Sequence, residues 1–450
     1  MYVSLSIWLK IKGLYNWNRN TMATDLIPRV KGVRDFYPED WALQKWLGET
    51  CIALGAGFGY QEYEGPVMEY MDLYLGKTSE EIVSRQTFTL SGRDEKSLVL
   101  RPELTPTLAR MVAQEEDRLV FPLRWQSYGR FYRYERPQRG RGRSFFQWNI
   151  DLLGSDTVHA DAEVITIACQ LFKTLGLSPG QVTVRVNDRQ GLECHLIRSL
   201  GLRSGQIRPL FAIVDRIDRM PFEKFSGGLA ELGLDSEQID GLVEMLESKD
   251  PGFSPRLEQV IRLLERNDVS EYVEPDLKIV RGFDYYTGIV FEAWAKHSLR
   301  RALFGGGRYD NLTLQVGGRK PVPGVGFAVG DMAITELLKE SDLLDHVTSP
   351  VADLLVSVFS EDTAEQAASY ARLARSRGLA VELGLKPGQR LDRQLKYAHR
   401  KGIPFVTIIG PDEVSSKTVL LKNLATGEQT VLPSCNVGKL AELIRHYRQR

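Results

Sequence analysis

Seven arginines and one glutamate lie among the twenty residues from Arg124 to Arg143. In LRWQSYGRFYRYE (residues 123–135) the arginines alternate with aromatic residues on a predicted strand, so some of them must point into the structure. A charge cluster of this kind is usually a solvated loop. Arginine, however, offers a planar, permanently charged fork of donors that suits phosphate. The stretch therefore indicates a site for a phosphate-bearing ligand, and its loop arginines Arg139, Arg141 and Arg143 are candidates to reach a nucleotide or a nucleic-acid end.

The strand predicted after this loop, FFQWNIDLLG (residues 145–154), alternates between polar and apolar residues. Side chains of a strand point alternately to its two faces, so Gln147, Asn149 and Asp151 fall on one face and the apolar residues between them on the other. A sheet with one face of this kind suits a charged ligand that forms hydrogen bonds.

A second candidate cluster lies in KIVRGFDYYTGIVFE (residues 278–292), where Arg281 precedes the pair Tyr285 and Tyr286. Tyrosine can pack against a small ring such as imidazole and form a hydrogen bond with it. A core strand with a surface salt bridge explains the same residues, so the residues alone leave both interpretations open.

Short helices and antiparallel strands are predicted around the first cluster, with few βαβ units. Helices are expected at residues 41–56 and 161–175 and a hairpin at residues 87–103, and Thr105 is expected to cap the helix through ARMVAQEE. A doubly wound nucleotide-binding fold is therefore not expected, and the absence of GxxxxGK[ST] excludes a P-loop. The run GVGFAVG (residues 324–330) is interpreted as tight strand-to-helix packing.

The rest of the chain divides into two further parts. Residues 191–274 are mostly helical and carry no chemical motif, which indicates an inserted helical module. From residue 350 apolar strand-like runs alternate with helical segments, a pattern typical of a small α/β domain. Gly378 and Gly402 stand where helix C-termini need a left-handed residue.

Bulk composition excludes few classes of function. The chain has 450 residues, of which 43% are hydrophobic, and 58 basic residues balance 58 acidic ones, so net charge identifies no partner. The four cysteines are far apart, which argues against a zinc site or disulfide framework and favours the cytoplasm. Residues 1–21 are too short an apolar run for a membrane span, so we expect no membrane association. Either Met22 is the natural start or residues 1–21 form a disordered extension.

Several motifs together resemble class II aminoacyl-tRNA synthetases, and within them the histidyl-tRNA synthetase family. LVLRPELTPTLARM resembles the LRPE-x-T segment, and GRFYRYERPQRGRGRSFFQ resembles motif 2. IVRGFDYYTGIVFE and GGGRYDNL resemble the two histidine-specific signatures. The segment from Lys396 to Gln429 is similar to the C-terminal anticodon-binding domain. Motifs in the right order over nearly the whole chain after Met22 make the resemblance specific.

The resemblance implies an α+β catalytic domain with an antiparallel sheet, a helical insertion and a C-terminal α/β anticodon-binding domain. The implied boundaries are an extension at residues 1–21, a catalytic core at residues 22–190 and 275–345, the insertion at 191–274 and the anticodon-binding domain at 350–450. It also implies a homodimer formed through the region around Gly65 and Pro66.

The implied activity is ATP-dependent attachment of L-histidine to tRNA(His) through a histidyl-adenylate, with Mg²⁺ leaving on pyrophosphate. Arg133 and Arg281 would be catalytic, and both would hold the α-phosphate of ATP. Glu135 would lie near adenine, with Phe145 stacked beneath it. The implied histidine-binding residues are Glu103, Thr105, Gln147, Asp151, Tyr285 and Tyr286. The motif 2 loop would contact the acceptor end of the tRNA, and Arg393, Lys396 and Arg400 would face its anticodon stem unless they form a solvated helix face.

The sequence departs from the family at motif 3, which usually ends in an arginine that contacts the ATP tail. Here GVGFAVGDMAITELL has Asp331, Met332 and Ala333, with Arg308 or Arg319 as possible substitutes. Two other functions therefore stay open: a non-catalytic paralogue that regulates the first enzyme of histidine biosynthesis, and a tRNA-binding sensor. The paralogue characteristically lacks the anticodon-binding domain and has eroded histidine signatures, whereas this chain has both.

Overall fold

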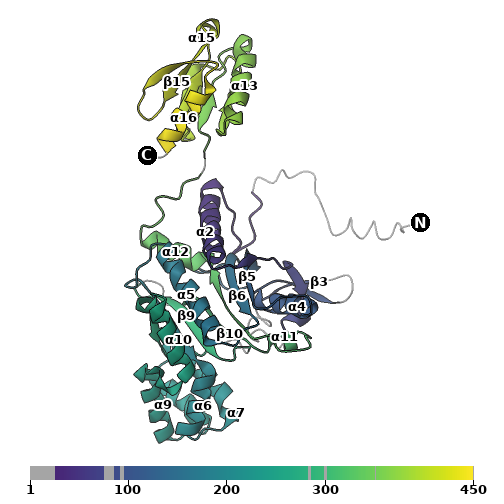
Figure 1. Cartoon of the computed structure of the whole chain (residues 1–450), viewed down its shortest axis with the longest axis vertical. Coiled ribbons are helices and arrows are strands. Elements are labelled where there is room, and N and C mark those ends of the chain that lie inside the picture. The colour runs from purple at the N-terminus through teal and green to yellow at the C-terminus, as the bar shows by residue number, and fades with distance from the viewer. Residues whose placement is uncertain are drawn as a thin grey trace, which may run out of the picture. The chain divides into compact units, whose positions relative to one another are not determined.

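The computed structural model describes residues 26–75, 86–91, 96–281, 285–297, 302–349 and 351–448 (Figure 1). The expected N-terminal extension, residues 1–21, lies outside this range. The chain divides into two compact units, residues 1–347 and 348–450. No helix among the described residues is long and apolar enough to span a bilayer.

An eight-stranded sheet forms the centre of the first unit. Its strands, in order across the sheet, are β1 (Gln61–Glu62), β5 (Leu123–Tyr132), β6 (Ser144–Leu153), β11 (Gly324–Gly330), β10 (Ala302–Arg308), β9 (Ile289–Ala295), β7 (Val182–Asp188) and β8 (Val273–Pro275). Neighbours are antiparallel except for the pairs β1–β5 and β7–β8 at its edges. The predicted antiparallel sheet and its arginine-rich hairpin, β5–β6, are confirmed.

Four helices bury their apolar side chains against one face of this sheet: α2 (Pro38–Gly57), α5 (Val158–Thr174), α10 (Pro255–Arg266) and α12 (Asp331–Glu340). Trp148 and Ile150 of β6 are fully buried in the core beneath them. The helices expected at residues 41–56 and 161–175 are confirmed, and both begin three residues earlier. Pro38 starts α2 with a preset φ, and the Thr157 side chain caps α5 by accepting from the N–H of Ala160.

A second, three-stranded sheet is formed by β2 (Met68–Tyr70), β4 (Ser97–Leu100) and β3 (Phe88–Ser91), with α4 (Thr105–Glu115) after it. The expected hairpin is confirmed as β3–β4, whereas the expected cap at Thr105 is wrong. Leu104 occupies the cap position, Thr105 begins the helix, and Pro106 follows in the first turn, where its missing N–H costs nothing. The Thr105 hydroxyl is thereby left to another partner.

Four consecutive helices follow β7: α6 (Arg189–Ser199), α7 (Ser204–Val214), α8 (Phe222–Glu231) and α9 (Ser236–Ser248). They enclose a hydrophobic core of their own, which includes Leu210, Phe225 and Leu242. In Figure 1 α6, α7 and α9 form one group beyond the edge of the large sheet. The next helix, α10, instead packs on α5 as part of the main core.

The second unit is a five-stranded sheet with helices on both faces. Its strands, in order across the sheet, are β13 (Val381–Leu383), β12 (Leu354–Val356), β14 (Phe405–Ile408), β15 (Thr418–Asn423) and β16 (Gln429–Pro433). Helices α13 (Glu361–Ser376) and α16 (Val437–Arg448) share one core and α14 (Leu391–Arg400) the other. The predicted alternation is confirmed, as are left-handed Gly378 and Gly402, with φ of 82° and 74°. The antiparallel hairpin β15–β16 extends this sheet at one edge.

A buried ion cluster joins three elements of the first unit. Arg308 of β10 is 2% exposed, and its Nη2 lies 2.7 Å from Oδ1 of Asp161 in α5. Arg256 of α10 reaches Oδ2 of the same carboxylate at 2.6 Å. Removing one member of such a buried pair leaves the others charged and without full compensation. Arg308 therefore serves to hold the helices on the sheet.

We predict that Arg308→Ala lowers the free energy of unfolding by about 3–5 kcal/mol. Arg319→Ala is the matched control: Arg319 also pairs with carboxylates, Glu116 and Asp117, but its side chain is 69% exposed, so its loss should lower the stability much less. Urea denaturation followed by circular dichroism measures both. Equal losses in the two variants would contradict the structural role of Arg308.

Candidate active site

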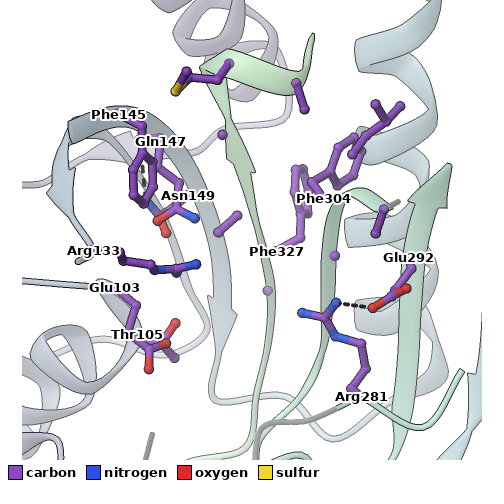
Figure 2. A pocket seen from close by; sticks show the side chains of 18 of the residues that line it. Glu103, Thr105, Arg133, Phe145, Gln147, Asn149, Arg281, Glu292, Phe304 and Phe327 are labelled. Carbon is purple, nitrogen blue, oxygen red and sulfur yellow. Dashed lines mark hydrogen bonds and ion pairs between the residues drawn. The ribbon is translucent and has the colours of Figure 1, made fainter. Parts of the chain in front are cut away.

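A cavity of about 320 Å³ opens on the face of the large sheet opposite the four covering helices. The alternation of β6 makes one wall of it: Phe145, Gln147, Asn149 and Asp151 line the cavity, as the sequence predicted for the last three. The other lining residues come from the β5–β6 loop, from the turn before β9, from β9, β10 and β11, and from the starts of α4 and α12. Figure 2 shows Arg133 and Glu103 on one side, with Arg281 and Glu292 facing them.

One end of the cavity combines carboxylates with tyrosines. Tyr285 donates its hydroxyl to Oε2 of Glu103 at 3.1 Å, and it is also hydrogen-bonded to Thr105. The ring of Tyr286 lies 4.9 Å from that of Tyr285. Burial raises the pKa of Tyr285 well above its usual range, so this hydroxyl stays protonated and can donate. The arrangement offers a negatively charged, hydrogen-bonding site for a cationic group.

Asp151 is the second acid of this end, and it is 4% exposed. Tyr309, at the end of β10, donates a hydrogen bond to its Oδ1. Burial raises the pKa of the Asp151 carboxyl to about 7, while the Tyr309 hydrogen bond acts in the opposite direction. Nearby, Oε1 of Gln147 is buried and has no hydrogen-bond partner among the described residues, so it is available to a ligand donor.

The other end of the cavity carries arginines and an aromatic ring. Arg133 donates from Nε to the backbone oxygen of Pro102 at 2.9 Å, and its guanidinium carbon lies 5.3 Å from the ring centre of Phe145. The hydrogen bond fixes the stem of Arg133 while its terminal nitrogens point into the cavity (Figure 2). Arg141 of the loop lines the mouth and pairs with Glu135 at 2.8 Å.

Arg281 enters from the opposite wall and forms an ion pair with Glu292 of β9. Both side chains are about 85% buried, with 14% and 15% exposed. Arg281 has φ = 58°, a left-handed conformation that is uncommon for a residue with a Cβ. Gly305 of β10 makes room for it, because a Cβ there would overlap the Arg281 guanidinium. Such strained residues persist where surrounding contacts hold them, often at functional sites.

All ten residues that the sequence singled out line this one cavity: Glu103, Thr105, Arg133, Glu135, Phe145, Gln147, Asp151, Arg281, Tyr285 and Tyr286. Of the three loop arginines, Arg139, Arg141 and Arg143, only Arg141 lines the cavity. Arg139 pairs with Glu336 and Glu340 of α12, and Arg143 lies over the Tyr134 ring at 3.8 Å. Arg139 and Arg143 therefore do not line this cavity, and their contact with a nucleotide or a nucleic-acid end stays a prediction.

Neither suggested substitute for the motif 3 arginine lines the cavity. Arg308 is committed to the buried cluster with Asp161, and Arg319 pairs with Glu116 and Asp117. The charge of each is matched by partners outside the cavity, so a contact of either arginine with a nucleotide stays a prediction without support from this geometry.

Glu292, Tyr309 and Met332 are among the lining residues to which sequence reasoning gave no role. Glu292 had a signal, since a charged residue in the apolar run IVFEAWA must be paired or face a cavity. Tyr309 lies in GGGRYDNL, but no local pattern shows that its hydroxyl meets Asp151, 158 residues earlier. Met332 was noted only as one of the residues, with Asp331 and Ala333, of the segment that lacks the motif 3 arginine.

The geometry brings guanidinium groups from two sides to the middle of a cavity whose far end is acidic. Such a site can hold a zwitterion by its cationic groups and place its carboxylate beside a phosphate, because arginines neutralise both anions. Among the described residues there is no cluster of three or more His, Cys, Asp and Glu that could hold a metal ion.

Comparison with protein families gives two matches. The histidyl-tRNA synthetase model matches residues 32–334, and the anticodon-binding domain model matches residues 353–445. The first match includes the whole cavity and the second falls within the second unit.

Individual proteins agree with these models. The histidine–tRNA ligase of Thermoplasma volcanium is 36% identical over 423 residues, covering 90% of this chain and 96% of that protein. The chloroplastic/mitochondrial histidine–tRNA ligase of Arabidopsis thaliana is 35% identical, covering 89% and 83%. The crystal structure of histidyl-tRNA synthetase from Nostoc sp. PCC 7120 superposes with a TM-score of 0.78 over 94% of this chain and all of that one. At 23% identity this superposition shows a shared fold.

The raised pKa of Asp151 predicts a pH-dependent stability. A folded-state pKa of about 7 lies above the ordinary 3.8, so the proton is held more tightly in the folded protein. The stability from Asp151 is therefore complete below about pH 4 and is lost as the pH rises through 7. Asp151→Asn cannot ionise, so relative to it the native protein should lose up to about 4 kcal/mol between pH 4 and pH 8. Urea unfolding midpoints of the two proteins across this pH range test the prediction. A difference in stability between them that does not change with pH would contradict the raised pKa.

Proposed function

The chain belongs to the histidyl-tRNA synthetase family, and on that premise we propose that it is a histidine–tRNA ligase that works through the cavity of the first unit. It joins L-histidine to ATP as histidyl-adenylate and transfers the histidyl group to tRNA(His). The observation that carries the assignment of the site is the facing pair Arg133 and Arg281, set on opposite walls of a cavity with an acidic end.

In the first step a carboxylate oxygen of histidine bonds to the α-phosphorus of ATP, and the bond from that phosphorus to the bridging oxygen of pyrophosphate breaks. Two anions must approach, so positioned positive charge is the main need. Arg133 and Arg281 stabilise the α-phosphate from two sides as charge builds on it. In the second step a 3′-terminal hydroxyl of the tRNA attacks the histidyl carbonyl carbon, and AMP leaves.

Histidine is bound at the acidic end. Glu103 and Thr105 take its ammonium group, together with the unpartnered Oε1 of Gln147. Asp151 and the tyrosine pair take the imidazole. A pocket built to pair with a polar ring rejects amino acids that cannot form hydrogen bonds with its buried polar groups. Asp151 stands where many members of the family carry glutamate, and the Tyr309 hydroxyl holds the shorter side chain.

Mg²⁺ comes as part of the substrate, bound to the triphosphate, and leaves with pyrophosphate. Two carboxylates of the cavity wall, Glu135 and Glu292, are of the chemical type that Mg²⁺ prefers. In this structure both are engaged by arginines.

The tRNA meets both units in this proposal. The hairpin loop contacts its acceptor end, where Arg139 is 62% exposed. In the second unit, Arg393, Lys396 and Arg400 are exposed along α14, a basic face suited to the phosphates of the anticodon stem.

We also propose a homodimer and a cytoplasmic location. The homodimer is supported by apolar side chains that lie exposed on and beside the small sheet after Gly65 and Pro66: Val67 at 43%, Met68 at 49%, Tyr70 at 44% and Leu90 at 44%. Such a patch favours a protein contact. The cytoplasm is supported by four free cysteines, of which Cys194 and Cys435 are exposed.

The regulatory paralogue and the tRNA-binding sensor are less favoured. The chain has a match to the anticodon-binding domain and a cavity in which both arginines and the histidine-facing acids meet. A protein that only binds histidine or tRNA has no need for two arginines at the position of a reacting phosphorus.

Histidine-dependent exchange of pyrophosphate into ATP tests the catalytic function. The full chain with MgATP and histidine should incorporate labelled pyrophosphate into ATP, and tRNA(His) should accept labelled histidine. Well-folded protein that shows no exchange would eliminate the ligase and leave the two binding functions.

We predict that Arg281→Ala lowers the rate of adenylate formation by about 10²–10³-fold and changes the dissociation constant of histidine less than about threefold, because its charge acts mainly as the phosphorus reacts. Single-turnover kinetics and calorimetric titration measure the two effects. Arg185→Ala is a matched control, since Arg185 also pairs with carboxylates, Glu274 and Asp276, but outside the cavity. Equal losses of binding and rate in Arg281→Ala would indicate a structural role.

Residues 1–347, without the second unit, should retain histidine-dependent exchange within a few-fold of the full chain. Aminoacylation should weaken by at least about tenfold in kcat/KM for tRNA, since a separate compact unit carries the anticodon contacts. Parallel exchange and charging assays test this. Loss of exchange would mean that the second unit also supports the catalytic unit.

A further inference from the structure

The chain immediately before Arg281 lies between two hydrophobic cores. Leu277 and Val280 are fully buried, and their side chains belong to the core of the helical module formed by α6, α7, α8 and α9. Ile279, which stands between them in the sequence, belongs instead to the core that contains Tyr285 of the cavity. This short segment is therefore packed against the helical module on one side and against the catalytic sheet on the other.

Hydrogen bonds hold the backbone of the same segment to the end of β7. Asn187 is fully buried, and its Nδ2 donates to the backbone oxygens of Leu277 at 3.1 Å and Ile279 at 3.0 Å. The backbone N–H of Asp276 donates to the backbone oxygen of Val186 at 3.0 Å. Because β7 leads directly into α6, the strand end that starts the helical module also fixes the segment before Arg281.

A second link joins the helical module to the chain after Tyr285. Arg189, the first residue of α6, donates from Nη1 to the backbone oxygen of Tyr286 at 3.4 Å. Its guanidinium carbon lies 5.5 Å from the ring centre of Phe211 in α7. The module thus contacts the chain both before Arg281 and after Tyr285.

These contacts bear on the conformation of Arg281. Its φ of 58° is uncommon for a residue with a Cβ and persists only where neighbouring contacts hold the backbone. Glu292 holds the guanidinium end of the side chain in the cavity (Figure 2), whereas Val280 and its neighbours hold the backbone end. The guanidinium lies at the end of a long side chain, so a small rotation of the backbone at Val280 displaces it by a larger distance.

We propose that the helical module positions Arg281 for adenylate formation, with Val280 and Asn187 as the positioning residues. The inference rests on the proposed function, in which Arg281 stabilises the reacting phosphate. Among the described residues, none of α6, α7, α8 and α9 lines the cavity. The module therefore acts on the reaction through the backbone of Arg281 and has no contact with the substrates in the cavity.

Two valine variants of the full chain test this role. Val280→Ala should lower the single-turnover rate of adenylate formation by about tenfold and leave the calorimetric dissociation constant of histidine unchanged. Val214→Ala is the matched control, because Val214 ends α7, is 1% exposed and belongs to the same core. It loses the same two methyl groups but lies away from the segment before Arg281, so it should change neither quantity.

Double variants show whether the effect passes through Arg281. In an Arg281→Ala background, Val280→Ala should lower the rate no further, because residues that act as one unit are not additive. Asn187→Ala removes the two hydrogen bonds to the segment and leaves the apolar core of the module intact. It should lower the rate in the native background and have no effect in the Arg281→Ala background.

Amide hydrogen exchange of residues 276–281 provides a readout that needs no activity. Val280→Ala and Asn187→Ala should both speed this exchange relative to Val214→Ala, because the segment is then held less firmly. Unchanged exchange in both variants would overturn the proposal. Equal rates of adenylate formation in Val280→Ala and Val214→Ala would also overturn it, as would a further loss in the double variants. Failure of the proposed function differs, since the native protein itself then shows no exchange of pyrophosphate into ATP.

Discussion

A β-strand can present only every second side chain to one face, and the first unit depends on this constraint at β6. Trp148 and Ile150 are fully buried under the helices, and the Trp148 indole N–H donates to Gln126 at 3.1 Å. The residues between them are thereby held on the opposite face, where the cavity lies. A shift of register by one residue would exchange the two sets. The packing of the core on one face of β6 therefore also fixes the orientation of Gln147 and Asp151 on the other face.

Two arginines of the cavity have carboxylate partners before any ligand enters. Arg281 is paired with Glu292 and Arg141 with Glu135. A buried guanidinium without a partner costs several kcal/mol. An incoming phosphate can take over these pairings because it offers the same bidentate oxygen geometry as a carboxylate. The ion pairs therefore keep the arginines buried, oriented and charged at small cost to the fold.

The alternation of β6, the two hairpins and the left-handed glycines Gly378 and Gly402 could be predicted because each depends on neighbours in the sequence. The motifs also named ten residues that share one cavity, whose individual roles stay predictions. The failures concern interactions that the local sequence does not encode. Thr105 has the residue type of a helix cap, but the helix begins at Thr105 itself, one residue earlier than a cap at Thr105 would need. Arg308 looked available to a nucleotide, whereas its partner Asp161 lies 147 residues away.

The floor of the cavity is made of glycine. A Cβ on Gly305 would overlap Arg281, and one on Gly326 would overlap the Asp151 carboxylate, so the sheet is thinnest where the substrates would lie. The space that these missing side chains leave is filled by the Arg281 guanidinium and the Asp151 carboxylate, and ligands that bind to these groups complete the packing of this face. In the ligand-free protein, local opening should therefore be most frequent at β10 and β11. Bound ligands should slow amide hydrogen exchange in the middle of the sheet as well as in its loops. Bound substrates therefore contribute to the packing and hydrogen bonding of the first unit for as long as they stay in the cavity.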